Sequence, residues 1–88
     1  MNVKFEASFA RDLKRIKDRR LLRRVQKAIE KIKAAPGLDE IRDLKKMQGY
    51  DTFYRVRLGD YRIGMEVVAG EVIFVRILHR KDIYRHFP

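Results

Sequence analysis

Three arginines lie close together on the two arms of one predicted β-hairpin. Between the arms, Gly59-Asp60 has the composition of a two-residue turn, because glycine readily adopts the positive φ that such turns require. Strand alternation then places Arg55, Arg57 and Arg62 on one face, with Arg57 directly opposite Arg62. Like charges opposite each other destabilise a sheet. We therefore predict that this face, called the arginine face below, binds an anion, and phosphate is the leading candidate.

The other face of the same hairpin is predicted to belong to the core. Gly64 falls on the arginine face, where its missing side chain is expected to leave a hollow beside Arg55. The apolar and aromatic residues that alternate with these positions are Tyr54, Val56, Leu58, Tyr61, Ile63, Met65 and Val67.

The side chains available for chemistry are cations, tyrosines and two late histidines. The sequence has no glycine-rich phosphate loop, no Ser-His-Asp arrangement and no paired carboxylates. The set suits metal-free RNA cleavage, in which the ribose 2′-OH attacks the adjacent phosphate and arginines stabilise the developing charge. Arginine is a poor base. The proton acceptor is therefore Tyr84, His79 or His86, each of which could equally be a packing or an exposed residue.

Composition narrows the class of protein. The 88 residues include 22 Lys+Arg and 12 Asp+Glu, a net charge of +10 that favours nucleic acid, an acidic partner, or both. The charge could also be the solvated surface of a heat-adapted protein, but such surfaces usually carry as many acidic as basic residues, and this chain does not. Without cysteine, disulfides and cysteine-bound zinc are excluded, and two histidines are too few for a metal site. We expect a cytoplasmic protein, since no membrane span or signal peptide is visible.

The elements that carry these residues begin with a strand and two helices. Asn2–Glu6 alternates as a short strand, Ser8 is predicted to cap the first helix, and Asp18 the second. Pro36-Gly37 ends the second helix. Their charged outer faces are interpreted chiefly as solvated surface. Apolar residues recur at helical spacing at Phe9, Leu13, Ile16, Leu21, Leu22, Val25, Ala28, Ile29 and Ile32.

A loop over Gly37–Tyr50 is predicted to lead into the hairpin, and a third strand to span Val72–Leu78. A two-residue turn before that strand would point Arg76 into the core. A three-residue turn would instead bury Ile73, Val75 and Ile77 and leave Arg76 on the arginine face. Burial of an unpaired arginine is costly, so we predict the second register.

The predicted fold is therefore one α+β domain over residues 1–88. It comprises a small antiparallel sheet with an N-terminal strand, a two-helix hairpin packed on one face, and a three-strand C-terminal meander. The polar tail from His79 to Pro88 is predicted to form one short helical turn.

Two segments give the sequence a family resemblance. YRVRLGDYR (Tyr54–Arg62) and HRKDIYR (His79–Arg85), placed after a strand and two helices, resemble the RelE/ParE toxin superfamily over the whole chain, closest to the RelE branch. That resemblance implies a toxin of a type II toxin–antitoxin system. Its activity would be that of a ribosome-dependent, metal-free endoribonuclease that cleaves mRNA, inhibits translation and needs no cofactor.

The resemblance also implies roles for individual residues. Arg57, Arg62, Arg80 and Tyr84 match catalytic positions; Arg62 would stabilise the transition state and Tyr84 would contact the substrate near the 2′-OH. The best-known members carry lysines on the first hairpin arm where this chain has arginines, which leaves the identity of the base open. Contacts with RNA are expected from Arg55, Arg76, His79 and Lys81.

The implied partners are a RelB-like acidic antitoxin, the ribosome and mRNA, with operator DNA bound by the toxin–antitoxin complex through the antitoxin. Two alternatives use the same sequence features. A ParE-like toxin would inhibit DNA gyrase without nuclease activity, and a basic module would bind nucleic acid without catalysis. The presence of Arg80 and Tyr84 together with three hairpin arginines favours the nuclease.

Overall fold

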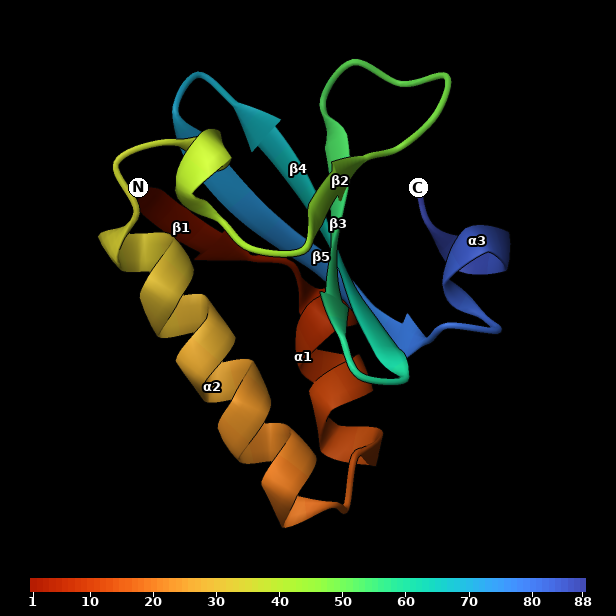
Figure 1. Ribbon diagram of the computed structural model, residues 1–88. Helices are drawn as coiled ribbons and strands as arrows, with labels where there is room; N and C mark the ends of the chain where they lie inside the picture. The colour runs from red at the N-terminus through yellow and green to blue at the C-terminus, as the bar shows by residue number, and fades with distance from the viewer.

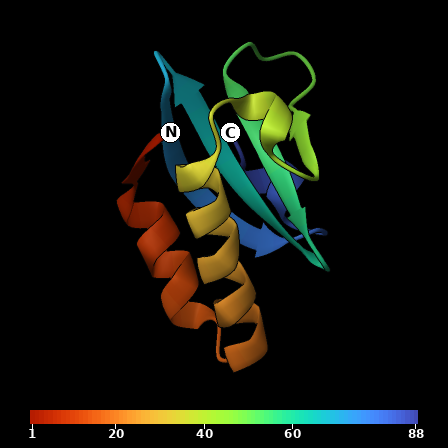
Figure 2. The same ribbon diagram turned by 60° about the vertical axis from the view of Figure 1, so that its left-hand side comes forward.

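A computed structural model describes residues 1–88 as a twisted five-stranded sheet with α1 and α2 on one face and α3 on the other (Figures 1 and 2). The predicted α+β class is confirmed. No helix is both long and apolar enough to cross a membrane. The elements are β1 (Asn2–Phe5), α1 (Ala7–Arg15), α2 (Arg19–Ala34), a 3-10 turn (Leu38–Glu40), β2 (Leu44–Lys46), β3 (Phe53–Leu58), β4 (Tyr61–Val68), β5 (Glu71–His79) and α3 (Ile83–His86).

The sheet is mixed, with the strand order β1-β5-β4-β3-β2. Strands β2 to β5 form an antiparallel meander, whereas β1 pairs parallel with β5, from Asn2↔Glu71 to Phe5↔Phe74. The prediction of an all-antiparallel sheet is wrong for this one pair. Alternation along a strand reports which side chains face the core and carries no information about direction.

Strand β2 lies inside the segment predicted to be a loop. Leu44 pairs with Val56 and packs against the core, while Lys45 and Lys46 are exposed. The loop prediction is therefore wrong for these three residues. A three-residue strand at the sheet edge needs no apolar alternation, and exposed lysines are a common way to protect such an edge from further pairing.

The two long helices begin differently from one another. Asp18 caps α2 as predicted, because its Oδ1 accepts the backbone N–H of Arg20 at 2.9 Å and of Leu21 at 3.3 Å. The predicted cap at Ser8 is wrong: α1 starts at Ala7, and the Ser8 hydroxyl donates to the carbonyl oxygen of Val75 at 2.6 Å. That bond ties the first helix to β5.

The main core lies between the helix pair and the sheet. The predicted core face of the hairpin is confirmed, with Tyr54, Leu58 and Tyr61 packed around its fully buried members. The buried residues of this core are Phe9, Leu21, Val25, Ile32, Val56, Ile63, Met65, Val72, Phe74 and Ile77.

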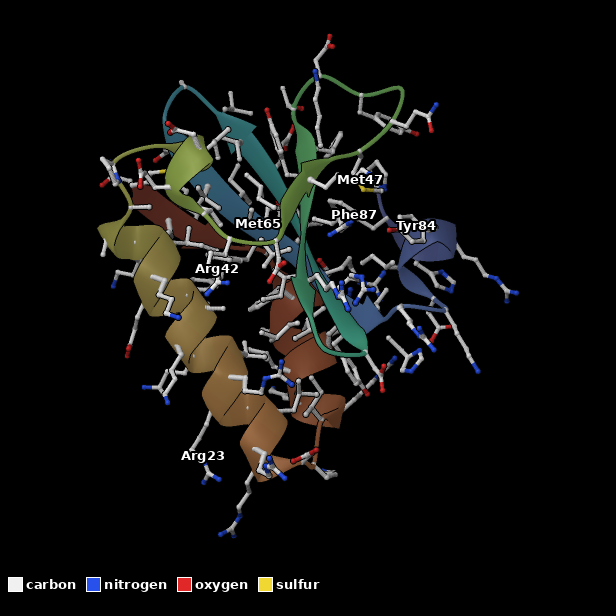
Figure 3. All side chains as sticks on the ribbon, viewed as in Figure 1. Arg23, Arg42, Met47, Met65, Tyr84 and Phe87 are labelled. Carbon is white, nitrogen blue, oxygen red and sulfur yellow. The ribbon has the colours of Figure 1, made fainter.

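A second, smaller core covers the opposite face of the sheet and was not predicted. Met47, Ile83 and Phe87 form it, and Figure 3 shows Met47 and Phe87 between β2 and α3. The hollow predicted at Gly64 is filled: a Cβ atom there would lie 2.7 Å from a ring carbon of Phe87. The C-terminal segment is thus packed onto the sheet beside Arg55.

Strand β5 follows neither of the two registers considered. Its turn has two residues, since Val68 pairs with Glu71, but a bulge opposite Gly64 and Met65 makes Val75 an extra residue. Val72 and Phe74 are buried before the bulge, and Ile77 after it. The predicted burial of Ile73 and Val75 in the main core is wrong because the turn has two residues. The bulge then shifts the alternation by one residue, so that Ile77 enters the core as predicted.

Candidate nucleic-acid interface

The hairpin of β3 and β4 has the predicted register. Arg57 pairs with Arg62 and Arg55 pairs with Gly64, and the turn residue Gly59 has a φ of 61°. Val56 and Ile63, which alternate with the arginines, are buried in the main core. The three arginines are therefore assigned to the face opposite α1 and α2.

Arg62 has an unusual hydrogen-bonding pattern. Its Nη1 donates to the carbonyl oxygens of Gly59 at 2.7 Å and Tyr61 at 2.9 Å, which holds the guanidinium at the hairpin turn. Its Nε is buried without any partner. A buried donor without an acceptor costs about 1–3 kcal/mol. The exposed Arg57, which pairs with Arg62, is the cation of this pair that a bound anion reaches directly.

The end of β5 is brought to the same turn. The backbone N–H of Arg80 donates to the carbonyl oxygen of Asp60 at 2.7 Å, and its Nε lies 3.9 Å from Asp60 Oδ1. The rings of His79 and Tyr61 meet edge to face at 5.6 Å. Because His79 Nδ1 accepts the backbone N–H of Lys81 at 3.2 Å, the neutral ring carries its proton on Nε2. In that tautomer Nε2–H can donate a hydrogen bond. Because His79 pairs with Tyr61, its side chain lies on the helix side of the sheet, opposite the arginine face.

Arg76 does not extend onto the arginine face. Its Nε and Nη2 bind the two carboxylate oxygens of Asp12 at 2.8 and 3.1 Å, and Asp12 also accepts the backbone N–H of Ile77 at 3.0 Å. The hydrogen bond to Asp12 raises the pKa of Arg76 above its ordinary value. Arg76 pairs with Gly64, so the register agrees with its predicted place on the arginine face, but its guanidinium is bound to Asp12 of α1. Its predicted contact with RNA stays a prediction. A contact between Arg76 and RNA would require this pair to open.

Arg55 and Tyr84 line a separate pocket of about 430 Å³ between the β2–β3 loop and the C-terminal segment. Arg55 Nη1 donates to the carbonyl oxygen of Asp43 at 3.1 Å, and Lys45 is its cross-strand neighbour. Tyr84 projects from α3 and is 60% exposed (Figure 3). This pocket lies on the same sheet face as the paired Arg57 and Arg62.

The predicted site residues therefore divide into groups. Arg57, Arg62 and Arg80 gather at the β3–β4 turn. His79 reaches the same turn on the helix side of the sheet, through Tyr61, and Lys81 is exposed. Arg55 and Tyr84 form the second group, and Arg76 stands apart with Asp12. Positive charge, an imidazole and an exposed phenol are groups that can bind a phosphodiester.

Comparisons with known proteins identify the family. Residues 3–84 match the model of the ParE toxin of type II toxin–antitoxin systems. The toxin RelE3 of Methanocaldococcus jannaschii is 42% identical over 89 residues, an alignment that covers 100% of both proteins. The chain belongs to the RelE/ParE superfamily of type II toxins.

Solved structures extend this toxin assignment. The RelB–RelE antitoxin–toxin complex from Methanococcus jannaschii matches with a TM-score of 0.82 and 40% identity, over 97% of this chain and 99% of that one. An archaeal RelE–RelB complex from Pyrococcus horikoshii matches with a TM-score of 0.72 and 24% identity, over 90% and 93% of the two chains. At 24% identity, the second match supports only the fold of this chain and says nothing of its activity.

Two residues of the toxin's pocket were missed from the sequence. Lys45 belongs to a strand that was predicted to be a loop, and Gln48 follows in the β2–β3 loop. The packing of the tail had one available signal. Ile83 and Phe87 are four residues apart, the spacing of one face of a helical turn, and both are buried.

Proposed function

We propose that this toxin is a ribosome-dependent, metal-free endoribonuclease that cleaves mRNA and so inhibits translation. One observation carries the proposal. Arg57 and Arg62 pair across the hairpin on the face away from α1 and α2, and the backbone of Arg80 is tied to the same turn. A phosphate group is the ligand that such a set recognises best.

In the proposed reaction the ribose 2′-oxygen attacks the neighbouring phosphorus while the bond from phosphorus to the 5′-oxygen breaks. The products are a cyclic phosphate and a free 5′-hydroxyl. Arg57, Arg62 and Arg80 stabilise the charge that develops on the phosphorus oxygens. The proton of the 2′-OH passes to solvent water and the leaving 5′-oxygen takes a proton from solvent water, while His79 is proposed to contact the RNA. Tyr84 approaches the 2′-OH from α3.

The proposed regulatory partner is an acidic, RelB-like antitoxin. The net charge of +10 favours an acidic protein, and the similar RelE structure from Methanococcus jannaschii is a complex with RelB. Such a partner is expected to be partly disordered when free and to fold on contact, which lets a short chain cover a large surface.

A second candidate function is supported by the family model, which is named for ParE. A ParE-like toxin would bind and inhibit DNA gyrase without chemistry of its own. The 42% identity to a RelE toxin over the whole chain favours the nuclease. The nuclease would cleave mRNA, whereas the ParE-like toxin would leave mRNA intact and block DNA supercoiling by gyrase.

The deciding experiment is a purified translation reaction with 3′-end mapping of the mRNA, run beside a gyrase supercoiling assay. We expect the toxin to produce discrete mRNA ends only when ribosomes are present, and to leave gyrase active. Intact mRNA together with inhibited gyrase would establish the ParE function in place of the nuclease. Cleavage of free mRNA at an equal rate would refute ribosome dependence.

A further inference from the structure

The pocket beside Arg55 has a wall that the catalytic groups do not use. This wall is the β2–β3 loop, residues 47–52. From it Tyr50, 47% exposed, lines the pocket that Tyr84, 60% exposed, also lines. Large aromatic rings are rarely left in solvent without a reason when two of them share one pocket. Exposed aromatic rings are the platforms on which unpaired nucleobases stack.

The loop is held in place before any ligand arrives. Met47 donates its backbone N–H to the carbonyl oxygen of Phe53 at 2.8 Å, and the carbonyl oxygen of Thr52 accepts from Val67 at 2.8 Å. The side chain of Met47 is buried in the second core. The ring of Tyr50 is supported edge to face by Phe53 at 5.5 Å. A fixed wall avoids the ordering cost that a flexible loop would incur on binding.

The position of the pocket relative to the arginine face favours a nucleotide. Arg55 lines the pocket and lies two residues from Arg57 on β3, a separation of about 7 Å along the strand. An RNA strand whose phosphate is held at Arg57 therefore brings the neighbouring nucleotide to the pocket mouth. Lys45, opposite Arg55 on β2, adds a second cation for the backbone.

Gln48 is the one carboxamide in the pocket wall. A carboxamide presents a donor and an acceptor side by side, the pattern that complements the exocyclic amine and ring nitrogen of adenine. We propose that the pocket binds an unstacked base next to the cleaved phosphate, with Gln48 selecting adenine and Tyr50 stacking on the ring. This inference rests on the proposed nuclease function and specifies which sequences the enzyme cuts.

The first test compares cleavage positions made by the wild type, Gln48→Ala and Gln26→Ala in the translation reaction. Gln26, on the exposed side of α2, is the chain's other glutamine and gives a matched control. We expect wild type and Gln26→Ala to cut preferentially beside adenine, and Gln48→Ala to lose about 5- to 100-fold of that preference, since a bidentate base contact discriminates by this much. Unchanged cutting positions in Gln48→Ala would overturn the inference while the nuclease function stands.

The second test measures binding without cleavage. The equilibrium constant Kd is determined for a fluorescent, single-stranded oligoadenylate with wild type, Tyr50→Phe and Tyr50→Ala. Tyr50→Phe keeps the stacking surface and should bind like wild type, whereas Tyr50→Ala should raise Kd about 5- to 100-fold. If Tyr50→Ala raises Kd as expected but the wild type cuts no mRNA, the pocket assignment holds and the nuclease function fails. Equal Kd values for Tyr50→Ala and wild type would refute the stacking role.

Discussion

At the scale of single residues, Arg62 combines a fixed position with an unsatisfied donor. Its Nη1 is bound to the turn carbonyls, which fixes the guanidinium opposite Arg57, and its buried Nε has no partner. Arg62→Ala should lower single-turnover cleavage of ribosome-bound mRNA by a factor on the order of 10²–10³, the usual cost of losing one donor to a developing charge. Thermal unfolding should change little, because its two hydrogen bonds are local contacts to the carbonyl oxygens of Gly59 and Tyr61.

The matched control for Arg62 is Arg23→Ala, which removes an exposed arginine of α2 distant from Tyr84 and Phe87 (Figure 3). It should cleave like wild type. If Arg62→Ala also cleaves at the wild-type rate, the arginine face is not a catalytic site.

Tyr84 separates the role of a hydroxyl from that of a ring. The side chain is 60% exposed, so its ring contributes little packing to the fold. If the hydroxyl contacts the 2′-OH, Tyr84→Phe should slow the single-turnover step about tenfold, the value of one hydrogen bond, and leave the unfolding temperature unchanged. A rate for Tyr84→Phe that equals wild type, with a slow Tyr84→Ala, would instead assign the residue to stacking.

The individual arginines differ in how far the sequence could place them. Arg55, Arg57 and Arg62 lie where alternation and the Gly59 turn predicted, because a short hairpin is determined by local rules. Arg76 could not be placed in the same way. Its partner, Asp12, lies 64 positions away in the sequence, and nothing in the local pattern joins the two.

At the scale of elements, Asp12 joins α1 to β5. Its carboxylate is 4% exposed and accepts from Arg76 and from the backbone N–H of Ile77. Asp12→Ala should lower the free energy of unfolding by about 1–3 kcal/mol, because it leaves these donors without an acceptor. Asp51→Ala, which removes only an exposed contact to Lys46 at 3.8 Å, should change it by less than about 0.5 kcal/mol. If Asp12→Ala and the wild type have equal free energies of unfolding in urea titrations, the Asp12–Arg76 pair contributes nothing to stability.

The pKa of Arg76 sets the pH range of that contribution. Because Asp12 raises the pKa of Arg76 in the folded protein, the stabilisation is fully present below the ordinary arginine pKa. It is lost only as the pH rises through the higher folded value. The effect of Asp12→Ala on unfolding should therefore be constant across neutral pH.

The elements were predictable where one physical rule decides each of them. The helical spacing of apolar residues and the Asp18 cap predicted α2, and the alternation of apolar and polar residues predicted β3 and β4. The bulge in β5, the edge strand β2 and the parallel pairing of β1 depend on contacts between distant segments. Those contacts leave no local pattern, which is why the second core was missed as well.

At the scale of the whole molecule, the net charge of +10 governs encounters with partners. Association with an acidic antitoxin should be electrostatically steered, so the association rate constant should fall tenfold or more as salt is raised from low to high ionic strength. The dissociation rate should change much less, because buried contacts are weakly screened. Stopped-flow measurements at several salt concentrations test this. An association rate that is insensitive to salt would exclude steering by the basic surface.

The central position of β5 has a consequence for how the toxin is made. Ribosomes synthesise the chain from β1 onward, yet β1 pairs only with β5, and both α1 and α3 pack against that strand. Folding must therefore wait until the last quarter of the chain emerges from the exit tunnel. Nascent chains stalled before Glu71 has emerged should be digested rapidly by protease, and chains released through Phe87 should resist it. Protection of the shorter chains would mean that residues 1–70 fold without β5.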